Sequence, residues 1–163
     1  GNIGATNVLR TGRKGLAAAT LLLDLAKGLA AVWLAWRFMP ARVEQAAIGA
    51  FLGHCFPLWL AFRGGKGVAT TAGIAFGLGW PIGLAYALVW IGMLAATRIS
   101  SLAGMAAALA APLAAFAFGY PGFIKPLAGI AVAVLILHRA NIARLLAGTE
   151  PRLGASAQSG PEE

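Results

Sequence analysis

A short cationic segment rich in glycine is the part of the sequence best suited to chemistry. It occupies residues 62–70 (FRGGKGVAT) and lies between two apolar stretches. Glycines allow backbone N–H groups to converge on an anion, and the arginine and lysine supply positive charge. We therefore predict a phosphate site here. Its expected contacts are Lys66, Gly64, Gly65, Gly67 and Thr70; the plainer alternative is a basic turn without a ligand.

This segment does not match the phosphate loop of nucleotide-binding proteins. Leu60 stands where that motif requires its first glycine, and Gly67 replaces the Ser or Thr that follows the lysine. A magnesium-nucleotide site is therefore disfavoured. His54 precedes Lys66 by 12 residues and is a second candidate for binding phosphate, with a packed histidine as the alternative.

Two further polar clusters carry hydrogen-bond donors. Residues 1–10 (GNIGATNVLR) offer Asn2, Asn7 and Arg10 as phosphate ligands, or else a helix cap and an arginine at lipid headgroups. Residues 138–145 (HRANIARL) place His138, Asn141 and Arg144 at i, i+3 and i+6. On a helix these three side chains share one face and could position a polar substrate. The alternative is a basic helix end at the membrane surface.

Two remaining polar positions are more ambiguous. Ser101 follows Ser100 at the start of an apolar stretch, where it is either a catalytic hydroxyl or a helix N-cap. Asp24 and Lys27 lie at i and i+3 within another apolar stretch. Charged residues inside a membrane segment indicate function by default, but these two can neutralise each other, which favours a structural ion pair.

The composition predicts an all-α integral membrane protein. Of the 163 residues, 60% are hydrophobic and only 11% are charged, against roughly a quarter charged in soluble domains. We expect a polytopic helical bundle over residues 1–148, followed by a disordered polar tail at 149–163. Its six apolar segments are residues 15–37, 44–62, 68–79, 81–97, 101–118 and 124–138. The third segment is short for a full span of about 20 residues.

The basic residues separate the apolar segments and form no tail or stripe, which disfavours nucleic-acid binding. If all six segments cross the membrane, Arg37, Arg42 and Lys125 lie on one side. The other side receives nine: Arg10, Arg13, Lys14, Arg63, Lys66, Arg98, Arg139, Arg144 and Arg152. Because cytoplasmic loops are enriched in Lys and Arg, the polar clusters are predicted to face the cytoplasm.

The acidic and sulfur-containing residues exclude several chemistries. Three of the five carboxylates, Glu150, Glu162 and Glu163, fall in the expected tail, and Glu44 falls on the opposite side. Paired carboxylates for metal binding or glycoside hydrolysis are therefore not expected. The single cysteine, Cys55, excludes an internal disulfide and a cysteine metal cluster. We expect no metal and no cofactor.

Taken together, three segments resemble the bacterial PlsY-type glycerol-3-phosphate acyltransferases, membrane enzymes that use acyl-phosphate. They are residues 1–10 (GN-x-GATNV-x-R), residues 53–57 (GH-x-FP) with 64–70 (GGKGVAT), and residues 138–150 (HR-x-NI-x-RL with G-x-E). The resemblance implies seven membrane helices, six of them in this chain. The family's first helix and a motif serine would fall before Gly1, and Arg63 stands where the family often has lysine.

The resemblance also implies the reaction and its participants. A fatty acyl group would pass from acyl-phosphate to the 1-hydroxyl of glycerol 3-phosphate, giving lysophosphatidic acid and phosphate without a covalent enzyme intermediate. From the residues themselves we expect Lys66 and the loop amides to stabilise the leaving phosphate, and His138 and Asn141 to orient the hydroxyl. We expect a monomer in the bacterial cytoplasmic (inner) membrane. The alternative is a membrane transporter or binding protein for a small phosphorylated anion.

Overall fold

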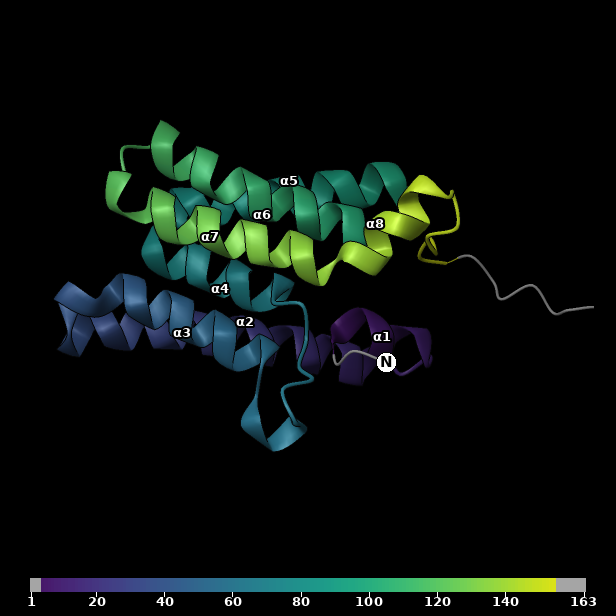
Figure 1. Cartoon of the computed structure of the whole chain (residues 1–163), viewed down its shortest axis with the longest axis horizontal. Coiled ribbons are helices and arrows are strands. Elements are labelled where there is room, and N and C mark those ends of the chain that lie inside the picture. The colour runs from purple at the N-terminus through teal and green to yellow at the C-terminus, as the bar shows by residue number, and fades with distance from the viewer. Residues whose placement is uncertain (1–3, 155–163) are drawn as a thin grey trace, which may run out of the picture.

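The computed structural model describes residues 4–154, and this part of the chain is all-α (Figure 1). The helices are α1 (Ala5–Arg10), α2 (Lys14–Phe38), α3 (Val43–Cys55), α4 (Val68–Leu78), α5 (Trp80–Thr97), α6 (Ser100–Ala117), α7 (Pro121–Leu137) and α8 (Arg139–Leu146). Two short 3-10 turns, Pro40–Arg42 and Leu58–Leu60, interrupt the connections. All six predicted apolar segments therefore contain a helix.

The second apolar segment is only partly helical, because α3 ends at Cys55 and does not continue to residue 62. Pro57 lacks an N–H donor and biases Phe56 away from helical dihedrals, so the helix stops just before them. The chain then turns sharply through Ala61 and Phe62, which both have positive φ angles of 49° and 61°. This turn returns the backbone toward α3 and leads into α4.

The helices differ in their capacity to cross a membrane. In the described residues, α2, α5 and α6 are long and apolar enough to span it. The pair α7 and α8, bent by 61°, makes a fourth span if it is counted as one. With 13 and 11 residues, α3 and α4 are shorter than a full span, so length alone supports fewer than the six crossings expected.

Helix α4 lies at the centre of the bundle and contacts α2, α3, α5, α6 and α7. Glycines permit its close approach to α2. A Cβ atom at Gly28 would overlap the carbonyl oxygen of Thr70, and one at Gly73 would overlap the carbonyl oxygen of Leu25. Small residues of this kind let membrane helices pack backbone against backbone. The central position of α4 places its N-terminus next to the polar ends of its neighbours.

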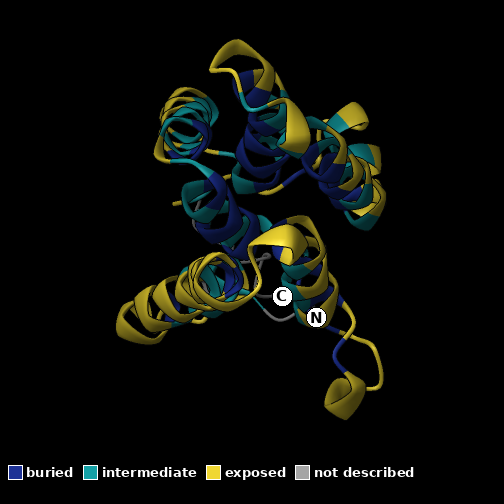
Figure 2. Ribbon diagram, turned by 90° about the vertical axis from the view of Figure 1, so that its left-hand side faces the viewer, coloured by how far each residue is buried: buried dark blue, intermediate teal, exposed yellow. Residues whose placement is uncertain are grey.

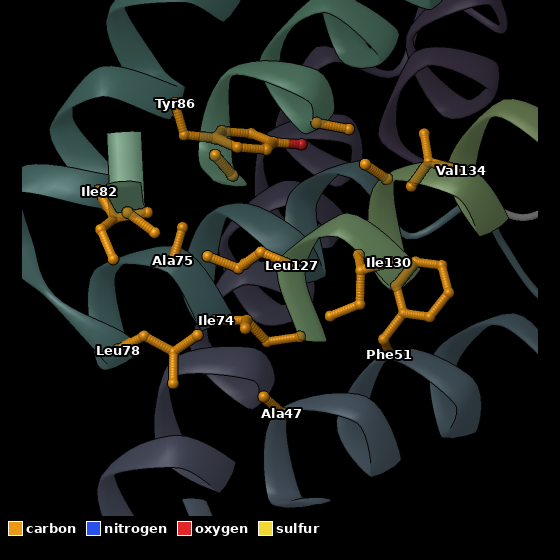
Figure 3. Close-up of a cluster of buried hydrophobic side chains, with 14 of the residues drawn as sticks. Ala47, Phe51, Ile74, Ala75, Leu78, Ile82, Tyr86, Leu127, Ile130 and Val134 are labelled. Carbon is orange, nitrogen blue, oxygen red and sulfur yellow. The ribbon is translucent and has the colours of Figure 1, made fainter. Parts of the chain in front are cut away.

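The apolar core lies between α3, α4, α5, α6 and α7, with a smaller contribution from α2. Phe51, Ile74, Tyr86, Leu127 and Ile130 project into it, and each is at most 3% exposed (Figure 3). The outer faces are exposed instead (Figure 2), and many of the exposed residues are large and hydrophobic, as along α2. Large apolar side chains on the outside are stable against lipid tails, so this distribution fits a protein surrounded by bilayer.

Candidate active site

A cavity of about 980 Å³ is lined in part by α1, α8 and the loop before α4. These elements lie toward the same end of the bundle (Figure 1). Segments that are distant in the sequence contribute its polar lining. Most predicted site residues line it: Asn7, His54, Gly64, Gly65, Lys66, Gly67, Ser101, His138, Asn141 and Arg144. The three motifs of the sequence thus converge on one space, although sequence spacing alone does not specify their contact.

Three of the predicted ligands are not placed in the cavity. Thr70 is fully buried in α4, its carbonyl oxygen lies against Gly28 of α2, and it does not line the cavity. Thr70 packs where α4 meets α2, and its buried hydroxyl oxygen has no hydrogen-bond partner within the described residues. Asn2 and the side chain of Arg10 lie outside what the structure describes.

A buried carboxylate that the sequence analysis assigned to the tail organises one wall of this site. Glu150 is only 8% exposed. Its Oε1 accepts hydrogen bonds from Ser101 Oγ and Asn141 Nδ2, both at 2.6 Å, and its Oε2 accepts one from Arg144 Nε at 2.7 Å. Glu150 is therefore part of the site. Ser101 serves as a donor to this carboxylate at the start of α6, and no side chain caps that helix.

A tight turn after α8 brings Glu150 back to the bundle. Gly148 has a φ of 69°, which favours glycine, and the N–H of Thr149 donates to the carbonyl of Arg144 at 2.8 Å. Farther on, the N–H of Leu153 donates to the carbonyl of Arg98 at 2.7 Å. In the sequence, the Gly148-x-Glu150 pattern was the feature that could have indicated that Glu150 belongs to the site. The rest of the expected tail, residues 155–163, lies outside the described residues.

Glu150 also determines the orientation of Asn141. Because the Asn141 amide nitrogen donates to the carboxylate, its carbonyl oxygen points the other way, where Lys66 Nζ donates to it. Burial opposes ionisation of Glu150. Its three hydrogen bonds and the nearby charge of Arg144 outweigh that effect and hold the Glu150 pKa below its ordinary value. A charged carboxylate is thus linked through one amide to the lysine of the glycine loop.

His138 lies at the bend between α7 and α8 and is 3% exposed. Its Nδ1 is 2.8 Å from the carbonyl oxygen of Val134. A carbonyl only accepts hydrogen bonds, so Nδ1 carries the proton and Nε2 of the neutral ring is an acceptor. His138 lines the cavity and can therefore receive a hydrogen bond from a substrate hydroxyl.

The glycine loop is built differently from the phosphate cradle that the sequence suggested. The N–H of Gly64 donates to the carbonyl of Cys55 at 3.0 Å, and the N–H of Gly65 donates to that of His54 at 3.3 Å. A Cβ atom at Gly64 would overlap both carbonyls. These two amides therefore attach the loop to the end of α3 and are not the donors expected to bind phosphate.

The donors available for an anion are those at the N-terminus of α4. This helix begins at Val68 after Gly67, whose φ is 80°, and no side chain caps it. The first N–H groups of a helix have no partner within it, and the helix dipole adds partial positive charge there. Tyr86 Oη donates to the carbonyl of Val68 at 2.9 Å and holds this helix start in place beside Lys66.

A second polar cluster joins α2 to α3 on another wall of the cavity. Lys27 Nζ lies 2.6 Å from Asp24 Oδ1 and 2.5 Å from His54 Nδ1, and His54 Nδ1 lies 3.4 Å from Asp24 Oδ1. The ion pair expected from the i, i+3 spacing is present. His54 lines the cavity, but its Nδ1 belongs to this cluster.

The comparisons with known proteins agree with this arrangement. The family described as glycerol-3-phosphate acyltransferase matches residues 1–148. A glycerol-3-phosphate acyltransferase of Erythrobacter litoralis is 66% identical over 154 residues, which are 94% of this chain and 78% of that protein. One from Mesorhizobium japonicum is 54% identical over 155 residues, 95% of this chain and 80% of that protein. The chain belongs to the glycerol-3-phosphate acyltransferase family.

Solved structures of this family share the fold. Two crystal structures of PlsY (YgiH), an integral membrane glycerol 3-phosphate acyltransferase, are each 35% identical and cover 94% of this chain. The glycerol 3-phosphate form has a TM-score of 0.90 with 79% of its chain covered; the lysophosphatidic acid form has 0.89 with 81%. The protein is thus an all-helical, multi-pass integral membrane acyltransferase of phospholipid synthesis.

Proposed function

We propose that the cavity transfers a fatty acyl group from acyl-phosphate to the 1-hydroxyl of glycerol 3-phosphate, releasing lysophosphatidic acid and inorganic phosphate. The observation that carries this proposal is the two-part character of the cavity. One end holds Lys66, Arg144 and the α4 N-terminus, and the other is an apolar arm between α4 and α5. A lipid-like donor with an anionic head requires both parts. The glycerol 3-phosphate and lysophosphatidic acid forms of the similar PlsY support the acceptor and the product.

Both proposed substrates carry phosphate, and the polar end has donors for two. Lys66 and the first N–H groups of α4 lie together and suit the phosphate that leaves the acyl group. Arg144 and Asn7 lie on other parts of the lining and suit the phosphate of glycerol 3-phosphate. Arg144 remains about 43% exposed while bonded to Glu150, so its other nitrogens can reach a ligand.

The chemical step is direct attack of the glycerol hydroxyl on the acyl carbonyl carbon. A new ester C–O bond forms, the bond between the acyl carbon and the phosphate oxygen breaks, and the hydroxyl proton ends on a phosphate. His138 Nε2 and the Asn141 side chain orient the hydroxyl, while Lys66 stabilises charge on the departing phosphate. Acyl-phosphate has a good leaving group, so neither an acyl-enzyme nor a cofactor is required.

The acyl chain occupies the apolar arm of the cavity. Ala72 and Phe76 of α4 form one side, and Ala87, Trp90 and Ile91 of α5 form the other. These side chains offer no charge and suit a fatty chain, whose burial from water is favourable by about 0.8 kcal/mol per methylene. A chain can therefore enter from the bilayer while its phosphate reaches Lys66.

We propose that the site faces the cytoplasm at a bacterial inner membrane, and the excess of basic residues on that side supports this orientation. In the proposed topology α1, α8 and the glycine loop lie on that face, where soluble glycerol 3-phosphate is available. We propose a monomer, because one chain supplies all the polar groups assigned to the reaction. The functional unit includes Glu150, and only the residues after it form the polar tail.

The test is product formation by the purified protein from radiolabelled glycerol 3-phosphate. Acyl-phosphate should support lysophosphatidic acid synthesis, whereas acyl-CoA and acyl-carrier protein should not. Lys66→Ala should lower kcat by at least about 100-fold, as removal of a transition-state donor does. Its melting temperature in detergent should stay near that of the wild type. Full activity of Lys66→Ala, or equal use of acyl-CoA, would contradict the proposal.

A further inference from the structure

The apolar arm of the cavity runs along α4 and α5, and its last lining residues on each helix can be identified. On α5 the lining follows one helical face through Ile91, Trp90, Ala87 and Tyr86. The next position on this face is Gly83, which is buried and does not line the cavity. The part of the lining that α5 supplies therefore ends at Gly83, which has no side chain.

Phe76 fills the space over Gly83. A Cβ atom placed at Gly83 would overlap Cγ and Cδ1 of the Phe76 ring, so the ring lies directly on the α5 backbone. Phe76 is also the last residue of α4 that lines the cavity. Behind it, Leu78 and Ile82 are buried in the core. The lining of the arm between the two helices therefore ends at this aromatic ring.

The distance from the polar end to this ring is limited. The α4 face of the arm runs from Ala69 through Ala72 to Phe76. A helical rise of about 1.5 Å per residue makes this stretch roughly 10 Å long. A chain that is longer than the arm must bend out toward the bilayer or leave methylenes unaccommodated. An aromatic side chain packed on a glycine is a rigid obstacle, because it has no space to withdraw into α5.

We propose that Phe76, seated on Gly83, is the stop that sets the acyl-chain length accepted by this enzyme. The inference rests on the proposed function, since it assigns the acyl chain to the arm that ends at this pair. The residue acts on donor specificity and takes no part in bond formation, because Phe76 lies about two helical turns from the start of α4.

The experiment compares kcat/KM for a series of acyl-phosphates of increasing chain length. In the wild type, kcat/KM should rise with each methylene until the arm is full and then level off or fall. Phe76→Ala should move that break to longer chains, with about a fourfold gain for each methylene newly buried, since a buried CH₂ is worth about 0.8 kcal/mol. Phe116→Ala on α6, where the ring is 76% exposed, is the matched control and should keep the wild-type profile.

A second variant tests the opposite direction. Ala72→Leu adds volume to the same α4 face one turn closer to Lys66 and should move the break to shorter chains. If Phe76→Ala does not fold, Phe76→Leu together with Ala72→Leu decides the question. An unchanged break in these variants, with activity retained, would overturn the inference while leaving the reaction intact. Absence of activity with every acyl-phosphate in the wild type would instead contradict the proposed function.

Discussion

The two polar clusters on the cavity walls have opposite constructions. Asp24 and Lys27 are neighbours on one helix, and the charge of the acid is balanced within a single turn. Glu150 instead accepts hydrogen bonds from residues of α6 and α8, and one of them, Ser101, is 49 residues away in the sequence. The first cluster satisfies its own charges. In the second cluster, Glu150 sets the orientation of the Asn141 side chain, and Asn141 in turn accepts a hydrogen bond from Lys66.

We assign the first cluster to the attachment of helices to each other and the second cluster to catalysis. The cluster of Asp24, Lys27 and His54 holds α2 against α3, and Lys27 remains about 45% exposed. In the second cluster Glu150, Ser101 and Asn141 are buried, and Asn141 bonds to the lysine that we assign to the chemical step. Mutations in the two clusters should therefore differ in size and in the property they change.

The largest effect is expected for Glu150→Ala. It leaves the hydroxyl of Ser101, the amide of Asn141 and the guanidinium of Arg144 without their acceptor. Leaving a buried donor without its acceptor costs about 1–3 kcal/mol for each group. The melting temperature in detergent should fall clearly and activity should be lost. A variant as stable and active as the wild type would contradict the role of Glu150 that distinguishes its cluster from that of Asp24.

Asn141→Ala should mainly affect catalysis. It breaks the connection between Glu150 and Lys66 but leaves Ser101 and Arg144 bonded to the carboxylate. We expect kcat to fall about 100-fold or more, by analogy with the loss of a positioned transition-state donor. The drop in melting temperature should be smaller than for Glu150→Ala. Equal losses of stability in the two variants would show that the amide is only structural.

The pH dependence of stability should report Glu150. Its pKa is lowered in the folded protein, so folding favours the charged form. The resulting stabilisation is present above the unfolded pKa and is lost as the pH falls through the lower folded value. Acidification below about pH 4.5 should therefore reduce the melting temperature of the wild type more than that of Glu150→Gln. Parallel curves for the two proteins would contradict the assignment.

The smallest effect is expected for Lys27→Met. The lysine is half-exposed and Asp24 keeps His54 as a neighbour, so the change should cost about 0–1 kcal/mol, as for other exposed pairs. Activity should stay within a few-fold of the wild type. If Lys27→Met instead impaired kcat as strongly as Asn141→Ala, the two clusters would share the catalytic role.

The sequence predicted the helices better than it predicted the loops. Its apolar segments all contain helices, and the short segment at 68–79 is the 11-residue α4. The end of α3 was missed, because hydrophobicity continues to Phe62 while the backbone turns at Pro57 and adopts positive φ at Ala61. Hydrophobicity averaged over a segment does not reveal local changes of this kind in the backbone dihedral angles.

The site residues were also predicted only in part. The spacing of His138, Asn141 and Arg144 was sufficient to place them in one cluster, because a helix sets that relation locally. Glu150 was missed as a member, since it reaches them only through the turn at Gly148. Gly64 and Gly65 were expected to bind phosphate with their amides, and their pairing with the end of α3 could not be foreseen from spacing.

The sequence by itself determined that this protein is a helical membrane protein with cationic, glycine-rich motifs. Helices satisfy their backbone hydrogen bonds locally, and lipid requires that they do so, so composition and periodicity suffice for that conclusion. Only the tertiary structure decided which groups meet. The contact of Ser101 with Glu150 and the seat of Phe76 on Gly83 arise from helix packing. Such contacts depend on how whole helices approach one another, which no local pattern of residues specifies.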